Sequence, residues 1–368
     1  ALCFGAVLCF YSTSFGQDIA LKEAVQWADS LMKTMSPAQR TAQLFMVAAY
    51  SKHGTQPTGQ VERLVVEQGV GGLIFMQGGP GRQLLQTNRL QEKAKVPLLL
   101  SIDGEWGLAM RLDSTMAFPY QMTLGAIQDE SLIRDMGRII GSQCRRIGLT
   151  MNMAPVIDVN NNPANPVINA RSFGDRPLRV GQLGAAYASG MQDRKVLACA
   201  KHFPGHGDTD ADSHHTLPSV NQSRERLDSV ELAPYQQLID AQVAAIMVAH
   251  LSVPALEPQS HLPTTLSYKV VGDLLKKQMN YSGLVVTDAL NMKGVSNSLP
   301  PGEVDAEALI AGNDVLLFSG DVPKAIAAIH QAILDGRISR QEVDARCRKI
   351  LIYKYLVGLH QWKALSIK

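Results

Sequence analysis

Eight short apolar runs, separated by longer segments of mixed polarity, are the feature that most constrains how this chain folds. The runs occupy residues 43–50, 69–78, 96–103, 149–159, 195–203, 244–253, 282–290 and 313–320. Most of them are almost continuously apolar, as expected for parallel strands that are covered on both faces. Eight such strands alternating with helices favour an α/β fold, a (β/α)8 TIM-type barrel forming one domain. A doubly wound open sheet is the alternative, but no glycine-rich nucleotide loop follows the first run.

Several segments between and after these runs show helical periodicity, among them 129–148, 268–279, 322–334 and 339–359. In the first of them, Asp129 and Glu130 mark a helix start and Gly148 marks its end. One stripe of this helix is predicted to contain Leu132, Met136, Ile139, Ile140 and Cys144. In the last segment, Ser339 is followed three residues later by Glu342, which is the pattern of a capping box at a helix start.

The charge balance excludes one broad class of partner. Lysine plus arginine number 35 against 33 acidic residues, so the formal net charge is only +2. Such a chain presents no field for gripping nucleic acid or an anionic membrane surface. We therefore expect neither nucleic acid nor a membrane among its partners, and the oligomeric state stays undetermined.

The first residues differ in character from the rest of the chain. They are apolar from Ala1 to Tyr11 and then become small and polar, ending in Ser14-Phe15-Gly16, a small-x-small cleavage pattern. The apolar run is too short to span a bilayer. We interpret residues 1–16 as part of a secretory signal and residues 17–368 as the mature domain, so the sequence predicts export to the periplasm or the exterior.

Cysteine usage points away from both disulfides and zinc. Outside the first segment only Cys144, Cys199 and Cys347 remain, an odd number at distant positions. No spacing among them suits a disulfide framework or a zinc site. We expect three buried thiols.

Ionisable residues recur where the predicted strands end. Asp103, Asp158, the pair Lys201-His202, His250 and Asp288 finish five of the eight runs. In a (β/α)8 barrel the carboxyl ends of the strands carry the chemistry. Because a buried charge without a partner is costly, packing alone does not explain charges at all five ends.

The stretch "KHFPGHGDTDADSHH", residues 201–215, permits several kinds of site. Asp208, Asp210 and Asp212 imitate the start of a calcium loop, but position six lacks glycine and position twelve lacks glutamate. A catalytic metal is disfavoured because the end of the first run, "AAYSKHG", lacks a His-x-His pair. Lys201 could form a Schiff base if burial lowered its pKa, but that would leave the aspartates without a role.

Glycoside hydrolysis would use more of these residues. It requires a carboxylate on one face of the sugar and a proton donor on the other. Asp288, in "VVTDAL" where a strand is expected to end, could act as nucleophile, and Asp212 lies two residues before His214. A carboxylate so placed can orient an imidazole and raise its pKa, which suits an acid/base catalyst. An exposed, solvated His214 is the competing interpretation.

The stretch "KHFPGHGDTDADSHHTLP" closely resembles the signature of β-N-acetylhexosaminidases of glycoside hydrolase family 3. Several other segments are similar to the family as well, so that the resemblance covers residues 35–360: "AQLFMV", "IDGEWGLAMRL", "NPANPVINARSFGDRP", "IMVAHLSVPAL" and "GLVVTDALNMKG". Other members act on glucosides and xylosides and usually take their acid/base from a second domain. The Asp-Ser-His triplet favours the hexosaminidase branch.

The resemblance implies a role for each matching residue. Asp288 would be the nucleophile of a retaining mechanism, and His214 the acid/base with Asp212 as its partner. The substrate-binding residues would be Asp103, Arg111, Arg171, Lys201, His202 and, in the same pocket, His250. The implied substrate is an oligosaccharide or muropeptide ending in β-linked N-acetylglucosamine, with no metal or other cofactor. Trp106 stands where this branch often has glycine, so it either stacks near a sugar face or packs behind the pocket.

Overall fold

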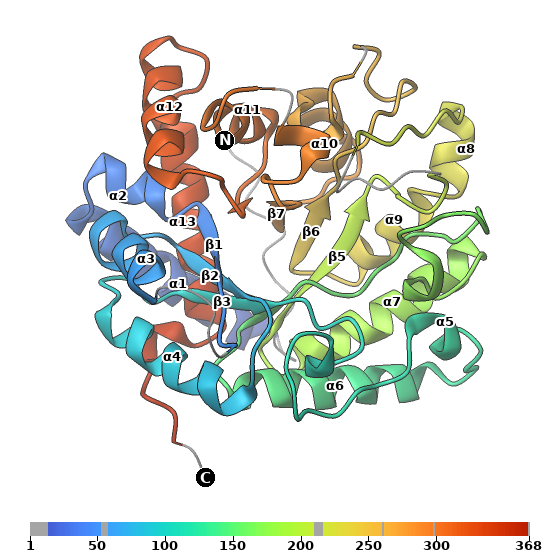
Figure 1. Cartoon of the computed structure of the whole chain (residues 1–368), viewed down its shortest axis with the longest axis horizontal. Helices are drawn as coiled ribbons and strands as arrows, with labels where there is room; N and C mark the ends of the chain where they lie inside the picture. The colour runs from blue at the N-terminus through green and yellow to red at the C-terminus, as the bar shows by residue number, and fades with distance from the viewer. Residues whose placement is uncertain (1–13, 53–57, 210–215, 260, 297–298, 367–368) are drawn as a thin grey trace.

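The computed structural model describes residues 14–52, 58–209, 216–259, 261–296 and 299–366. Its centre is a ring of eight parallel strands in the order β7-β6-β5-β4-β3-β2-β1-β8. A parallel bridge between Val286 and Val315 brings β7 beside the start of β8 and closes the ring. Figure 1 shows the helices arranged around the outside of these strands. The predicted (β/α)8 barrel is therefore confirmed.

Each apolar run contains one strand, but the strands are shorter than the runs. They are β1 Phe45–Ala49, β2 Gly72–Phe75, β3 Leu99–Ile102, β4 Met151–Asn152, β5 Leu197–Phe203, β6 Ala245–Val248, β7 Leu284–Thr287 and β8 Leu316–Leu317. Every residue of these strands is buried except Ala48, which is half-buried. Burial on both faces explains why the runs show no polar alternation.

The strand after residue 149 is the most interrupted one. β4 ends at Asn152, and Pro155 has no backbone N–H to donate to a neighbouring strand. Pairing with β5 nevertheless continues, because Lys201 donates its backbone N–H to Pro155 O and accepts from Ile157 N. This continuation carries Asp158 to the same end of the barrel as Lys201.

The helical layer consists of long and short elements. The α-helices are α1 Ser14–Thr34, α2 Pro37–Ala42, α3 Thr58–Arg63, α4 Pro80–Lys93, α5 Gln121–Leu124, α6 Glu130–Arg146, α7 Pro177–Gln192, α8 Arg224–Ser229, α9 Ala233–Asp240, α10 Lys293–Ser296, α11 Glu303–Ala311, α12 Val322–Leu334 and α13 Arg340–Leu356. Two π-helices cover Leu64–Gln68 and Lys269–Gln278, and four short 3-10 turns cover Leu108–Met110, Asn169–Arg171, Thr264–Leu266 and Leu359–Gln361. None of the described helices combines the length and the apolar character needed to cross a membrane.

The predicted helix boundaries agree with the structure. Asp129 caps α6 by accepting from Ser131 N. Ser339 and Glu342 form the expected capping box at the start of α13. The region predicted to be helical over 268–279 is helical too, but as the π-helix Lys269–Gln278.

The predicted stripe on α6 is only partly correct. Met136, Ile140 and Cys144 are buried, but Leu132 and Ile139 are 55% and 47% exposed. The buried face instead includes Ile133 and two glycines, Gly137 and Gly141. These glycines face α7, where a Cβ on Gly137 would lie 2.4 Å from Tyr187 O. The closest contact between the two helices is thus made through backbone, which a count of apolar side chains does not detect.

A buried ion cluster joins elements at the end of the barrel where the strands begin. The Asp314 carboxylate accepts from Val285 N at 2.8 Å and pairs with Lys276 at 3.0 Å and Lys349 at 2.8 Å. Burial would raise the pKa of Asp314, but the charges of Lys276 and Lys349 outweigh it and lower that pKa. The cluster therefore links β7, the segment before β8, a π-helix and α13 through one ionised side chain.

The three cysteines among the described residues, Cys144, Cys199 and Cys347, are free and buried, as predicted. Burial raises the pKa of the Cys144 thiol and of the Cys347 thiol to about 12. Burial likewise raises the pKa of the Cys199 thiol well above its usual range. All three therefore stay protonated at neutral pH and serve as apolar packing groups.

We expect the substitution Gly190→Ala to destabilise the fold by about 1–3 kcal/mol through overpacking. A Cβ at this position of α7 would lie 2.0 Å from the backbone oxygen of Arg134 in α6, so whole helices must shift. Urea-induced unfolding would measure the loss. Gly81→Ala in α4 is the matched control, because a Cβ there meets nothing within 4 Å and its stability should be unchanged or slightly raised. Equal midpoints for the two variants would contradict the close packing of α6 on α7.

Candidate active site

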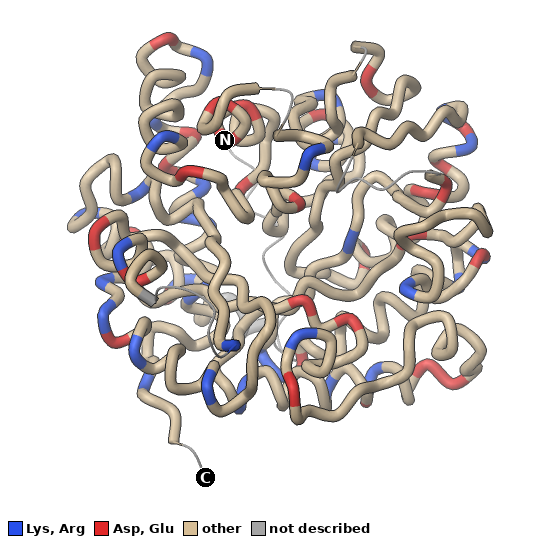
Figure 2. The backbone as a smooth tube through the Cα atoms, viewed as in Figure 1, with Lys and Arg blue, Asp and Glu red and all other residues tan. Residues whose placement is uncertain are grey.

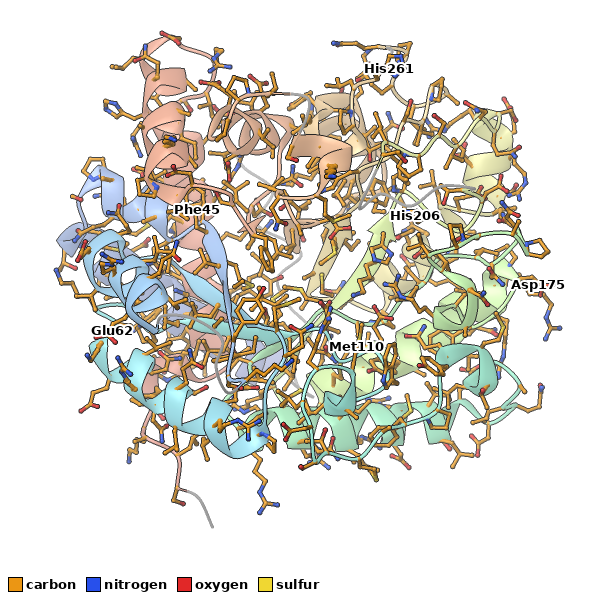
Figure 3. All side chains as sticks on the ribbon, in the orientation of Figure 1. Phe45, Glu62, Met110, Asp175, His206 and His261 are labelled. Carbon is orange, nitrogen blue, oxygen red and sulfur yellow. The ribbon has the colours of Figure 1, made fainter. Side chains whose placement is uncertain are left out.

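The carboxyl ends of the strands surround a cavity of about 610 Å³. Every site residue that was predicted from the sequence and lies in the described part of the chain lines this cavity, except His250: Asp103, Arg111, Arg171, Lys201, His202 and Asp288. Figure 3 shows two further lining residues, Met110 and His206, nearer the middle of the view, whereas Glu62, Asp175 and His261 lie at its periphery. The strands thus bring together residues that are up to 185 positions apart, as the difference between 288 and 103 shows.

A row of alternating charges forms one wall of the cavity. Lys201 Nζ lies 2.9 Å from Asp103 Oδ1 and 2.8 Å from Glu105 Oε1. Asp103 also pairs with Arg111 at 2.6 Å, and Glu105 accepts two hydrogen bonds from Arg171, at 2.9 and 2.8 Å. Such bidentate pairs fix the planes of both groups. These ion pairs therefore hold five side chains in a defined spatial order: Arg111, Asp103, Lys201, Glu105 and Arg171.

These pairs fix the protonation states. Burial would raise the pKa of Asp103 and of Glu105, but the Lys201 charge and the neighbouring arginines outweigh it, and both pKa values are lowered. Burial would lower the pKa of Lys201, yet Asp103 and Glu105 raise it above its usual value. An ammonium group so held has no free electron pair at neutral pH. The Schiff-base interpretation of Lys201 is therefore wrong for this arrangement.

A second carboxylate holds His202. The imidazole Nδ1 lies 2.7 Å from Asp158 Oδ2, and the peptide bond between Lys201 and His202 is cis. The opposite ring nitrogen, Nε2, lies 3.4 Å from Arg171 Nη2 and faces the cavity wall. Asp158 also accepts from the backbone N–H of His202 and of His206. Its pKa is lowered, because the His202 charge and these hydrogen bonds outweigh the effect of burial.

Asp288 follows β7 directly and is the carboxylate of the cavity that lacks a basic ion-pair partner among the described residues. Its Oδ1 accepts from the backbone N–H of Ala289 at 2.7 Å. Burial would raise the pKa of Asp288, but the His250 and His202 charges and this N–H lower it overall. The group is therefore an ionised carboxylate inside a cavity, with its charge not consumed by a salt bridge. That is the state a carboxylate nucleophile requires.

His250 is not among the residues that line the cavity. Its ring is fully buried, with Nδ1 2.7 Å from Thr265 Oγ1 and Nε2 3.0 Å from Ala289 O. Both ring nitrogens thus have partners within the protein. His250 is therefore absent from the cavity lining where the sequence analysis expected it, and its predicted contact with the sugar stays a prediction.

Two buried ionisable residues of the cavity lining were missed in the sequence-based assignment. Glu105 is 1% exposed and joins Lys201 to Arg171. The feature of the sequence that could have identified Glu105 is its position two residues after Asp103. His206 is also 1% exposed, and its Nδ1 lies 2.8 Å from Thr209 Oγ1. Burial and, second to it, the His202 charge lower the pKa of His206 to about 4, so this ring is neutral at neutral pH.

Asp212 and His214 fall outside the described residues, so their predicted roles stay predictions.

Trp106 is half-buried and packs against Tyr120, with ring centroids 4.6 Å apart. It is absent from the cavity lining, which favours packing over sugar stacking. Among the described residues, no three His, Cys, Asp or Glu side chains are grouped to hold a metal ion.

The charged residues elsewhere lie mostly on the outer helices. Figure 2 shows both signs interspersed around the ring, in keeping with a net charge of +2. Mixed surface charge gives no extended field of one sign. Among the described residues, the buried charges are organised in the cavity and in the Asp314 cluster at the other end of the barrel.

Comparison with known proteins identifies the family. The model for the glycosyl hydrolase family 3 N-terminal domain matches residues 38–352. Beta-hexosaminidase A of Pseudoalteromonas piscicida is 37% identical over 249 residues, which is 64% of this chain and 42% of that protein. A beta-N-acetylglucosaminidase/beta-glucosidase of Cellulomonas fimi is 29% identical, covering 92% of this chain and 61% of its own length.

A solved structure supports the same family assignment. The glycoside hydrolase family 3 β-N-acetylglucosaminidase of Paenibacillus sp. str. FPU-7 superposes with a TM-score of 0.85 at 39% identity. The match covers 91% of this chain and 65% of that one, so the chain spans less than two thirds of the length of each of these three relatives. With most of its length matched by the family model and by relatives of the same fold, the chain belongs to glycoside hydrolase family 3.

Proposed function

We propose that this protein is an exported, retaining exo-β-N-acetylglucosaminidase. The observation that carries the proposal is Asp288, a half-buried carboxylate kept ionised without a basic ion-pair partner among the described residues that line the cavity. The names of the relatives support N-acetylglucosamine as the sugar. Residues 1–16 support export, and peptidoglycan fragments ending in this sugar are the expected natural substrates.

The proposed reaction has two steps. Asp288 attacks the anomeric carbon, the glycosidic bond breaks, and His214 gives its proton to the leaving oxygen. His214 then removes a proton from water, which attacks the glycosyl-enzyme ester and releases Asp288 as a carboxylate. Two inversions give overall retention. Asp212 would orient His214 and stabilise its charged form.

The row of alternating charges suits a sugar ring rich in hydroxyl groups. Lys201, Arg111 and Arg171 offer donors, whereas Asp103 and Glu105 offer acceptors at fixed positions. These groups are already paired with one another, so little reorganisation is needed when a sugar binds. His202 adds a ring nitrogen on the same wall, held in orientation by Asp158.

A β-glucoside is the second candidate substrate, and one finding favours it. The Cellulomonas fimi relative carries both activities in its name, and it covers 92% of this chain. The preference between a β-glucoside and a β-N-acetylglucosaminide depends on whether the cavity wall leaves space for the acetamido group. A histidine acid/base also leaves room for phosphate as the acceptor in place of water.

We expect a panel of 4-nitrophenyl β-glycosides to rank the N-acetylglucosaminide above the glucoside and the xyloside in kcat/KM. Addition of EDTA should leave the rate unchanged. Proton NMR of the reaction should show the β-anomer of the free sugar first, because the mechanism retains configuration. A preference for the glucoside, the α-anomer as first product, or a sugar phosphate formed in phosphate buffer would each contradict the proposal.

Replacing the nucleophile tests the assignment directly. Asp288→Asn should lower kcat by about three orders of magnitude, because an amide cannot form the covalent intermediate. The control is Asp273→Asn, which removes an exposed carboxylate paired with Lys277 and should leave kcat near the wild-type value. A 5-fluoro glycosyl fluoride of N-acetylglucosamine should label wild-type protein on the peptide that contains Asp288. Labelling of another peptide would exclude this role.

Leaving-group dependence tests the proton donor. His214→Ala should lower kcat/KM by about 10²–10⁴-fold for phenyl glycosides, which need protonation of the departing oxygen. The loss should be much smaller for 2,4-dinitrophenyl glycosides, whose leaving group departs as an anion. Steady-state kinetics on both substrates would measure the difference. Equal losses on the two would show that His214 does not supply the proton.

A further inference from the structure

Asn165 occupies a junction between two loops of the cavity. It lies in the loop that leads to Arg171 and is 2% exposed. Its side-chain oxygen accepts from the backbone N–H of Val167 and of Ile168, both at 2.8 Å. Its side-chain nitrogen donates to His206 O at 2.8 Å, with Gly207 O at 3.1 Å and Thr209 Oγ1 at 3.3 Å. One amide thus holds two loops that start from different strands.

The first of these loops carries a sugar-binding group. Val167 lines the cavity, and its carbonyl oxygen accepts from Arg171 Nη1 at 3.1 Å. Ile168, which follows it, is fully buried. The position of this backbone therefore helps set where the Arg171 guanidinium meets Glu105. A shift of the Asn165 amide would be passed to Arg171 through Val167.

The second loop includes residues 206–209, which we call the stem. It comes directly before residues 210–215 in the sequence. Asn162 Nδ2 donates to Thr209 O at 3.2 Å, and Thr209 Oγ1 lies 2.8 Å from His206 Nδ1. A Cβ on Gly207 would lie 1.8 Å from Val159 O, so the stem is pressed against the loop after β4. The stem is therefore fixed in place up to Thr209.

We propose that Asn165 is a positioning residue that sets the Arg171 loop and the 206–209 stem relative to each other. It thereby aligns the sugar-binding wall with the segment that delivers the proton. The proposal rests on the proposed function, in which His214 follows this stem as acid/base. A buried amide with all its hydrogen-bonding groups engaged is suited to this task, since any displacement leaves polar atoms unpaired.

The test is a double-mutant cycle between Asn165→Ala and His214→Ala on two substrates. Asn165→Ala alone should lower kcat/KM by about 100-fold for phenyl β-N-acetylglucosaminide and by about tenfold for the 2,4-dinitrophenyl compound. The tenfold loss of kcat/KM that both substrates share reflects the displacement of Arg171. The additional tenfold loss for the phenyl substrate reflects weaker protonation of its leaving oxygen. In the His214→Ala background the additional loss should disappear. Equal losses on both substrates, or an additional loss that persists without His214, would overturn the proposal.

Asn88→Ala is the matched control. Asn88 also joins distant backbone, donating to Leu365 O at 2.8 Å and accepting from Leu365 N at 2.9 Å, but it is not among the residues that line the cavity. Its loss should affect both substrates alike and by less than about twofold. Thermal unfolding of each variant reports whether the fold is intact.

If Asn165→Ala fails to fold, Thr209→Val is the second variant. It keeps the shape of the side chain and removes the hydroxyl that contacts His206 and Asn165. It should lower kcat/KM for the phenyl substrate about threefold more than for the dinitrophenyl one. The absence of that difference would overturn the proposal. Failure of the proposed function is distinct, because then the wild-type protein cleaves neither substrate.

Discussion

The ammonium group of Lys201 is the interaction on which the site depends. It lies between Asp103 and Glu105, and each of those carboxylates is completed by an arginine. A buried ion is costly unless its partners surround it, and here each inner member of the row has two. The arrangement is possible because parallel strands end side by side, so that β3 and β5 present their residues to one space. The row therefore links the topology of the barrel to its chemistry.

The barrel could be predicted from the sequence because every strand is buried on both faces. Val285 and Leu316, for example, lie in runs without polar alternation, which distinguishes parallel barrel strands from half-exposed ones. The gathering of ionisable residues at the strand ends could be predicted as well. A side chain such as Asp288 at the end of a buried run requires a functional or structural partner. What the sequence could not give was the pairing among these groups.

Three differences from the sequence-based predictions have separate physical causes. Glu105 was overlooked because a strand-end rule identifies one residue, whereas the loop after β3 turns back and contributes a second carboxylate. His250 was expected to lie in the same pocket, but it is not among the lining residues, and its ring nitrogens contact Thr265 and Ala289. The face of α6 was misjudged because glycines, which have no side chain to count, make the closest contact with α7. The last two causes are three-dimensional contacts between segments far apart in the chain.

The buried thiols have a consequence for where such a fold can operate. Thiol–disulfide exchange requires an accessible thiolate, and Cys144, Cys199 and Cys347 are buried with their pKa values raised by desolvation. In the native state, oxidants and neighbouring disulfides therefore find no reactive sulfur among them. An uneven set of cysteines is usually a hazard for scrambling in an oxidising compartment. Here burial in the barrel protects these thiols from oxidation, whereas many extracellular domains rely on covalent cross-links.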